Sequence, residues 1–293
     1  MSTVDGPDFI CVGMPKAGTG WLYDQLQTHP DFWMPPVKEV LYLHREFPVI
    51  PLGGSRGGYG LKQLERHGRK NKPHQQPRNP ERDRGFREAA QEANGKAMDL
   101  DRYISLFRFK GEQLSGDISP MYTELDSEVI EKLVDRLPET KLIMIAREPV
   151  ARAWSRLCMF NRGSRLDKEM LDDPKRLREF LETSQIIQGK SFPTKIVEHW
   201  RKYAPNMQLR TFLFDGVAHD PERTRREIWT YLGADPSRQS DLPANYNRKS
   251  KNQKIEMSAQ AKDVLVDFFA DEIRACGEMF GGHARDWATR YGL

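Results

Sequence analysis

Short apolar runs along the chain are followed by stretches whose apolar residues recur at helical spacing. Phe9–Gly13 and Leu142–Ile145 are continuously apolar, which is typical of strands buried on both faces. Residues 209–214, with the sequence LRTFLF, are predicted to form a third strand. After the first run, Leu22 and Leu26 lie four positions apart, a spacing that places both on one face of a helix.

Helices are predicted between these strands and after the last of them. Their expected ranges are about 127–137, 149–157, about 194–203, a helix that begins at Asp220-Pro221-Glu222 and ends at Gly233, and about 258–279. Alternating strands and helices favour a mostly parallel sheet. We therefore predict an α/β fold, with a P-loop-like parallel sheet flanked by helices on both faces.

The segment 53–95 breaks this alternation. It opens with glycines, and between residues 62 and 88 it carries nine Lys or Arg against four Asp or Glu. We expect a mobile, basic insertion outside the core of a single domain that spans 1–293. Two interpretations stay open: a solvated insertion, or a lid or docking segment that favours anionic acceptors.

Composition narrows the class of protein. The 293 residues are 38% hydrophobic and carry a net charge of +4, which suits a polyanionic ligand better than nucleic acid. Cys11, Cys158 and Cys276 lie too far apart for a zinc site, so we expect buried thiols and no disulfide framework. Neither a leader peptide nor an apolar stretch of membrane-spanning length is visible, so we expect a cytoplasmic protein without a transmembrane segment.

The turn at residues 14–21, MPKAGTGW, has the composition of a phosphate-binding loop. It joins the first strand to the first helix, where backbone N–H groups and the helix dipole stabilise an anion. Gly18 and Gly20 allow close approach of the backbone, Lys16 adds a positive charge, and Thr19 adds a hydroxyl donor. Unlike a Walker A loop, this one has its lysine before the glycines and no Lys-Ser or Lys-Thr pair to hold Mg²⁺.

Residues 15–22, PKAGTGWL, resemble the P-K-x-G-T-T-x-L loop of sulfotransferases that use 3′-phosphoadenosine 5′-phosphosulfate (PAPS), in particular the heparan-type and bacterial members. Gly20 stands where that family usually has Thr or Ser, so one hydroxyl donor is absent. The resemblance implies that this loop binds the 5′-phosphosulfate. The implied contacts come from Lys16, Ala17, Gly18, Thr19, Gly20 and Trp21.

A second segment, residues 147–156 with the sequence REPVARAWSR, resembles the family motif R-[ND]-P-x-x-R-A-x-S-x. In the family this motif grips the 3′-phosphate. Arg147 at the end of a strand and Ser155 on the following helix can reach one phosphate, with the guanidinium binding it as a fork. Glu148 replaces the usual Asn or Asp.

Three shorter segments agree with the resemblance. Residues 116–122, GDISPMY, are similar to G-E-x-S-P-x-Y, and Asp286-Trp287 is similar to the usual ending of the family. Residues 246–251, YNRKSK, lie where the family has a basic loop that closes over the nucleotide. Nucleotide contacts are therefore implied for Tyr246, Arg248 and Lys249.

The resemblance also implies the chemistry. Sulfuryl transfer needs a cation at the leaving phosphate oxygen, a role that suits Lys16, and a base for the acceptor. Residues 37–43, VKEVLYL, match the K-E-x-x-x-[FL] segment of members that use a glutamate base, which implies Glu39 as the base and Lys38 beside it. His44 is the alternative base if Glu39 points away.

The predicted function is sulfuryl transfer from PAPS, without a metal, to a hydroxyl or amine of a carbohydrate, lipid or small-molecule acceptor. One rival is a P-loop kinase-like phosphotransferase, which would need a Mg²⁺ site. The other is a protein that binds the nucleotide without chemistry. Nucleic acid is not an expected partner, because the basic excess is local and lacks interleaved aromatic residues.

Overall fold

The structure, a computed structural model, describes residues 6–44, 79–246 and 255–293. In this part of the chain, four parallel strands form one sheet in the order β2-β1-β3-β4. The strands are β1 (Phe9–Gly13), β2 (Gly116–Ile118), β3 (Lys141–Ala146) and β4 (Leu209–Leu213). The predicted α/β fold with a parallel sheet is confirmed.

The two central strands are the most apolar because both of their faces are covered. In β1, Ile10 pairs with Asp117 of β2 on one side and with Leu142 of β3 on the other. Phe9 to Val12 have no solvent exposure, and Leu142 to Ala146 are buried as well. β2 has only three residues and was read in the sequence as part of a motif, because so short a strand carries no periodicity of its own.

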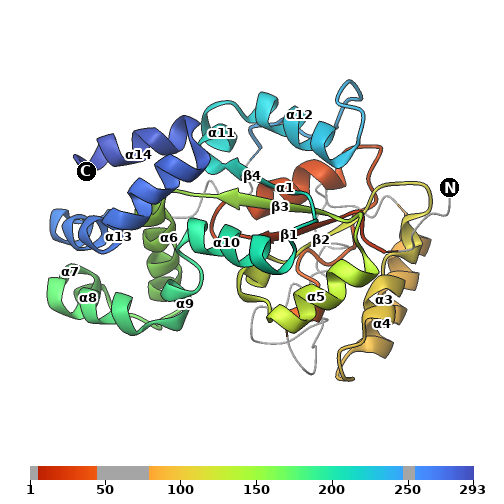
Figure 1. Ribbon diagram of the computed structural model, residues 1–293, viewed down its shortest axis with the longest axis horizontal. Helices are drawn as coiled ribbons and strands as arrows, with labels where there is room; N and C mark the ends of the chain where they lie inside the picture. Colours follow the sequence, from red (N-terminus) through yellow and green to blue (C-terminus); the bar gives the residue numbers. More distant parts are fainter. Residues whose placement is uncertain (1–5, 45–78, 247–254) are drawn as a thin grey trace.

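Helices lie on both sides of the sheet. Figure 1 shows α1 and α12 on one side, and α5 and α10 on the other. Their bounds are α1 (Thr19–Gln27), α5 (Ser127–Arg136), α10 (Pro193–Tyr203) and α12 (Pro221–Leu232), with the short α11 (Phe214–His219) directly after β4. The predicted helix at Asp220 begins there, since the Asp220 carboxylate accepts a hydrogen bond from the Arg223 N–H and Gly233 ends the helix in a left-handed conformation.

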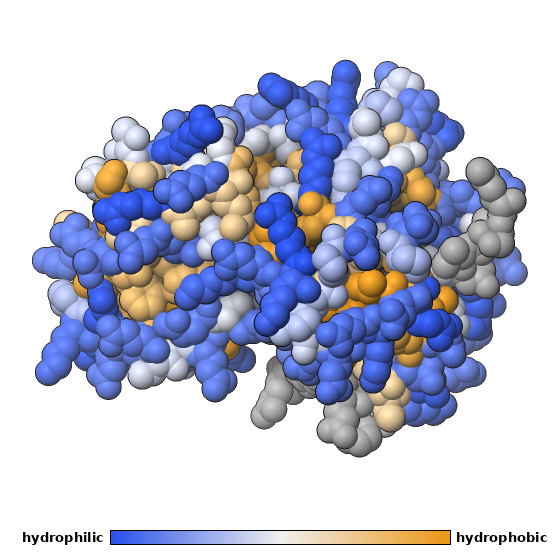
Figure 2. All heavy atoms as spheres, viewed as in Figure 1, coloured by the Kyte–Doolittle hydropathy of each residue, from blue (hydrophilic) through white to orange (hydrophobic). Residues whose placement is uncertain are grey.

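A second group of helices packs beyond the carboxyl ends of the strands (Figure 1). It consists of α6 (Pro149–Arg162), α7 (Lys168–Asp172), α8 (Pro174–Thr183), α9 (Gln185–Gln188), α13 (Ala259–Phe280) and α14 (Arg285–Tyr291). These helices have their own apolar cluster, in which Leu157, Leu177 and Phe269 are fully buried. Apolar residues show between charged ones on this side of the molecule in the space-filling view (Figure 2). Because the phosphate loop directly follows β1, it lies at the carboxyl ends of the strands, where the sheet meets this helical group.

The prediction that residues 53–95 lie outside the core is wrong for their last part. Residues 80–93 form α3 (Pro80–Ala93), and Phe86, Ala90 and Ala93 are fully buried in the main apolar cluster. The Asp83 carboxylate accepts a hydrogen bond from the Trp33 indole at 3.2 Å. The apolar positions recur at helical spacing, but the surrounding charges hid them from the sequence analysis. Residues 53–78 lie outside the described part.

The three cysteines are buried and unpaired, as expected. Two short 3-10 segments matter for the site described below: η1 (Tyr42–His44) and η4 (Pro120–Glu124). Across the residues that the structure describes, no helix has both the length and the apolar character that crossing a membrane requires.

Candidate active site

The phosphate loop follows β1 and ends at the first turn of α1. Gly18 caps the helix with φ 92°, a left-handed conformation that favours glycine. A Cβ built on Gly18 would lie 3.0 Å from the Phe214 ring, so the close approach of loop and ring also requires glycine. A Cβ on Gly20 would meet nothing within 4 Å, which leaves the backbone of the first helical turn accessible to a ligand.

Arg147 ties the loop to the end of β3. Its Nη1 donates a hydrogen bond to the Lys16 carbonyl at 2.9 Å. Its guanidinium carbon lies 4.7 Å from the centroid of the Phe214 ring, a cation–π contact. The ends of β1, β3 and β4 thus hold Arg147 and the loop together, as parallel strands do when their carboxyl ends meet at one edge.

Arg152 supports the loop from behind and was not assigned a role from the sequence. It is fully buried, its Nε donates to the Pro15 carbonyl at 3.1 Å, and its Nη1 donates to the Ser191 hydroxyl at 2.5 Å. Its Nη2 is buried without a hydrogen-bond partner. A buried, partly unsatisfied guanidinium indicates a site that an anion completes.

The site has an excess of positive charge. Burial lowers the pKa of Arg147, Arg152 and Arg156, that of Arg152 to about 9, and the charges of Arg156 and Arg147 contribute to the shift at Arg152. Arg152 therefore keeps its charge at neutral pH. Among the described residues, none of these three arginines forms an ion pair with a carboxylate. Such an arrangement suits a multiply charged anion.

Lys38 and Glu39 lie over the first turn of α1. The Lys38 ammonium donates to Glu39 Oε1 at 2.7 Å and to the Thr19 hydroxyl at 3.3 Å. The Glu39 side chain is 23% exposed and that of Lys38 is 10% exposed. Lys38 therefore links the predicted base to the phosphate loop, and Glu39 remains accessible to an acceptor.

A buried carboxylate holds the segment that carries Glu39. Asp117, at the middle of β2, accepts hydrogen bonds from the hydroxyls of Ser119 at 2.6 Å, Tyr122 at 2.8 Å and Tyr103 at 3.2 Å. Its pKa is raised to about 6 because burial outweighs these donors.

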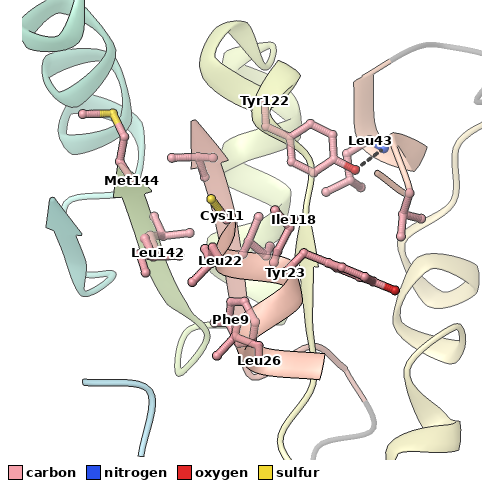
Figure 3. Packing of buried hydrophobic residues seen from close by; sticks show 14 of the residues in the cluster. Phe9, Cys11, Leu22, Tyr23, Leu26, Leu43, Ile118, Tyr122, Leu142 and Met144 are labelled. Atoms are coloured by element: carbon pink, nitrogen blue, oxygen red, sulfur yellow. Dashed lines mark hydrogen bonds between the residues drawn. The ribbon is translucent and has the colours of Figure 1, made fainter. Parts of the chain in front are cut away.

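The same hydroxyls also bind the backbone after Glu39. The Leu41 N–H donates to the Ser119 hydroxyl at 3.0 Å, and the Leu43 N–H donates to the Tyr122 hydroxyl at 3.2 Å (Figure 3). The Asp117, Ser119 and Tyr122 side chains therefore fix residues 40–43 against the sheet. The sequence signal for this was the 116–122 motif, but only the structure shows which backbone it binds.

The remaining predicted residues are placed as follows. Ala17 is fully buried, Ser155 lies partly exposed on α6, and His44 ends η1. The Trp21 indole donates to the Ala244 carbonyl at 2.6 Å, which brings the chain before Tyr246 against α1. Arg248 and Lys249 lie outside the described residues.

Glu148, the departure from the family motif, caps α6. Its two carboxylate oxygens accept from the Val150 N–H at 2.5 Å and the Ala151 N–H at 2.7 Å. The Tyr291 hydroxyl of α14 donates to the same carboxylate at 3.0 Å. Burial raises the pKa of Glu148, and these donors oppose that shift. The residue is therefore structural, and it joins the end of the chain to the Arg147 segment.

The parallel sheet, the glycine loop at the N-terminus of α1 and the buried Arg152 behind it define an α/β fold with a positively charged loop at the carboxyl ends of its strands. Residues 7–237 match the family model described as "Sulfotransferase family", and the chain belongs to this family. Sulfuryl transfer is the general activity that this membership supports. No curated protein sequence matches the chain.

Two solved structures share the fold. The sulfotransferase from Alicyclobacillus acidocaldarius is 22% identical with a TM-score of 0.63, over 96% of this chain and 98% of that one. The sulfotransferase domain from the curacin biosynthetic pathway is 12% identical with a TM-score of 0.50, over 90% of this chain and 98% of that one.

Proposed function

We propose that this sulfotransferase takes the sulfuryl group from PAPS and transfers it to a hydroxyl or amine of a carbohydrate, lipid or small-molecule acceptor. The observation that carries the proposal is the pair of arginines at the loop, Arg147 and the fully buried Arg152, with the Arg152 Nη2 lacking a partner. A donor with a 3′-phosphate and a 5′-phosphosulfate provides several negative charges to match them.

Each phosphate of the donor has a proposed group of partners. The backbone of residues 16–20 and the Thr19 hydroxyl serve the 5′-phosphosulfate, at the N-terminus of α1. Arg147 and Ser155 serve the 3′-phosphate, while Trp21 acts indirectly by anchoring the chain that leads to Tyr246. Arg248 and Lys249 stay predicted nucleotide contacts.

In the proposed reaction, the acceptor oxygen or nitrogen forms a bond to sulfur as the bond from sulfur to the bridging phosphate oxygen breaks. Glu39 takes the proton of the acceptor, and the electron pair of the broken bond stays on the phosphate, where Lys16 stabilises the charge. The products are the sulfated acceptor and adenosine 3′,5′-bisphosphate. Lys38 keeps Glu39 beside the loop and adds positive charge at the sulfuryl group.

The kinase-like alternative has less support. Ala17 follows the loop lysine, at the position where a Walker A loop has the Ser or Thr that binds Mg²⁺. A protein that binds the nucleotide without chemistry would have no need of the hydrogen-bonded Lys38–Glu39 pair.

The donor assignment is tested by calorimetry with adenosine 3′,5′-bisphosphate, with ATP and Mg²⁺ as the comparison. We expect the wild type to bind the bisphosphate, and Arg147→Ala to weaken binding by about tenfold or more, because a charge-assisted hydrogen bond contributes roughly 1.5–3 kcal/mol. Arg201→Ala, which changes an exposed arginine of α10, is the matched control and should bind like the wild type.

Two outcomes of the calorimetry would contradict these assignments. Binding of ATP with Mg²⁺ in the absence of bisphosphate binding would reject PAPS as the donor and favour the phosphotransferase. Equal affinity of Arg147→Ala and the wild type for the bisphosphate would remove Arg147 from the donor site.

A further inference from the structure

One face of α6 leads away from the phosphate loop. Arg152, Arg156 and Phe160 are spaced four residues apart, so they form a row along the helix over about 12 Å. The row begins at the loop, where Arg152 binds the Pro15 carbonyl. Phe160, at its far end, lies just over two helical turns beyond Arg152 along α6.

Two guanidinium groups contact the Phe160 ring at the far end of this row. The Arg156 guanidinium carbon lies 4.8 Å from the centroid of the Phe160 ring, and that of Arg165 lies 5.9 Å from the same centroid. The chain folds back after α6, since the Arg165 N–H donates to the Phe160 carbonyl at 2.9 Å. The ring thus gives both arginines a fixed, apolar support.

Neither guanidinium is neutralised by the protein in the part of the chain that the structure describes. Arg156 Nε is buried and has no hydrogen-bond partner, and neither arginine forms an ion pair with a carboxylate there. Arg165 lowers the pKa of Arg156 further than burial alone does, and the charge of Glu39 opposes this shift. Two like charges that share one ring are unfavourable unless an anion joins them.

We propose that Arg156 and Arg165 form a subsite for an anionic group of the acceptor, a carboxylate, a phosphate or a sulfate ester. The inference rests on the proposed function and names the substrate class of the same site. The charge of Glu39 favours the protonated form of Arg156, which supports a subsite on the same side of the loop as the proposed base. The donor phosphates have other partners in the loop, Arg147 and Ser155.

The anion has two possible sources, the acceptor and the donor, and two measurements separate them. The first is calorimetry of adenosine 3′,5′-bisphosphate with the wild type, Arg156→Gln, Arg165→Gln and the control Arg201→Gln. An acceptor subsite predicts affinities that agree within about twofold. A loss of about tenfold in Arg156→Gln would assign the arginines to the donor and overturn the proposal.

The second measurement uses two probes of nearly the same shape, the anion 4-hydroxybenzoate and the neutral 4-hydroxybenzamide, titrated into protein saturated with the bisphosphate. We expect the carboxylate to bind about tenfold more tightly than the amide, as one charge-assisted contact predicts. The preference should disappear in Arg156→Gln and decrease in Arg165→Gln, while Arg201→Gln keeps it.

A carboxylate that binds no better than its amide would reject the subsite, as would a preference that survives in a variant with both Arg156→Gln and Arg165→Gln. Arg165 is exposed, so Arg165→Gln remains informative if Arg156→Gln fails to fold. The probes are also titrated into protein without the bisphosphate. If the bisphosphate does not bind at all, the proposed donor fails, and this titration still decides on the anion subsite.

Discussion

Replacing Glu39 with glutamine is expected to lower kcat by about two to four orders of magnitude, the range that general acid–base catalysis contributes. Glutamine keeps the shape of the side chain and can still accept a hydrogen bond from Lys38, so the link to Thr19 is preserved. It cannot take up the proton of the acceptor. The loss should therefore appear in turnover, while the affinity for adenosine 3′,5′-bisphosphate stays near that of the wild type.

Turnover is measured as release of the bisphosphate from PAPS, with the best acceptor found in a panel of alcohols, phenols and amines. Glu88→Gln, which changes an exposed glutamate of α3, is the matched control and should turn over normally. If Glu39→Gln keeps kcat within about threefold, Glu39 is not the base. The same assay on His44→Asn then tests the alternative base.

Much of the fold could be predicted because its signals are local. The strands β1, β3 and β4 appear within a few residues of their predicted bounds. The turns of the two anion-binding segments lie next to such runs, so a strand followed by Lys16 or by Arg147 was sufficient to indicate the site. A buried parallel strand and the start of a helix can each be recognised from a pattern of about five to ten consecutive residues.

The rest depends on contacts between residues far apart in the chain. Arg152 donates a hydrogen bond to Ser191, and no sequence pattern near either residue predicts this contact. Asp117 reaches residues 40–43 only because β2 lies beside β1 in the sheet. A single sequence shows a carboxylate or a serine, but the partners follow from topology.

In α3, composition and apolar spacing point to different structures. The residues around Phe86 are dominated by arginine and glutamate, a composition that predicts a solvated segment, whereas the apolar side chains recur at helical spacing. In α3, long charged side chains occupy the solvent face, while a narrow face of Phe86 and three alanines is buried in the core. The narrow face accounts for the error, since alanine contributes little to an apolar pattern.

The second large effect is expected from Tyr122→Phe, which should lower kcat by about tenfold or more and leave bisphosphate affinity unchanged. The Tyr122 hydroxyl is the only contact that the structure gives between the Asp117 carboxylate and the Leu43 N–H in the described residues. Without it, a buried N–H loses its acceptor, at a cost of about 1–3 kcal/mol. The segment that carries Glu39 then leaves the position over Thr19 for part of the time, so fewer molecules are competent for transfer.

Tyr103→Phe is the matched control for this prediction. It removes a hydroxyl that donates to the same Asp117 oxygen, but that hydroxyl makes no hydrogen bond to residues 40–43. Both variants should lower the free energy of unfolding, whereas only Tyr122→Phe should lower kcat. Equal kcat values in the two variants would show that the Asp117 network stabilises the fold without positioning Glu39.

The pH profile gives an independent measure of the same coupling. Hydrogen-bond donors favour the ionised form of Asp117, so removal of the Tyr122 hydroxyl raises a pKa that is already about 6 in the wild type. The ionised carboxylate accepts from the hydroxyls of Ser119 and Tyr122, which in turn bind the Leu41 and Leu43 N–H groups, and protonation weakens these contacts as the pH falls. The acidic limb of kcat should therefore move to higher pH in Tyr122→Phe, and by less in Tyr103→Phe, whose hydroxyl lies farther from the carboxylate, at 3.2 Å against 2.8 Å. If the acidic limb stays at the same pH in both variants, the ionisation of Asp117 does not control kcat.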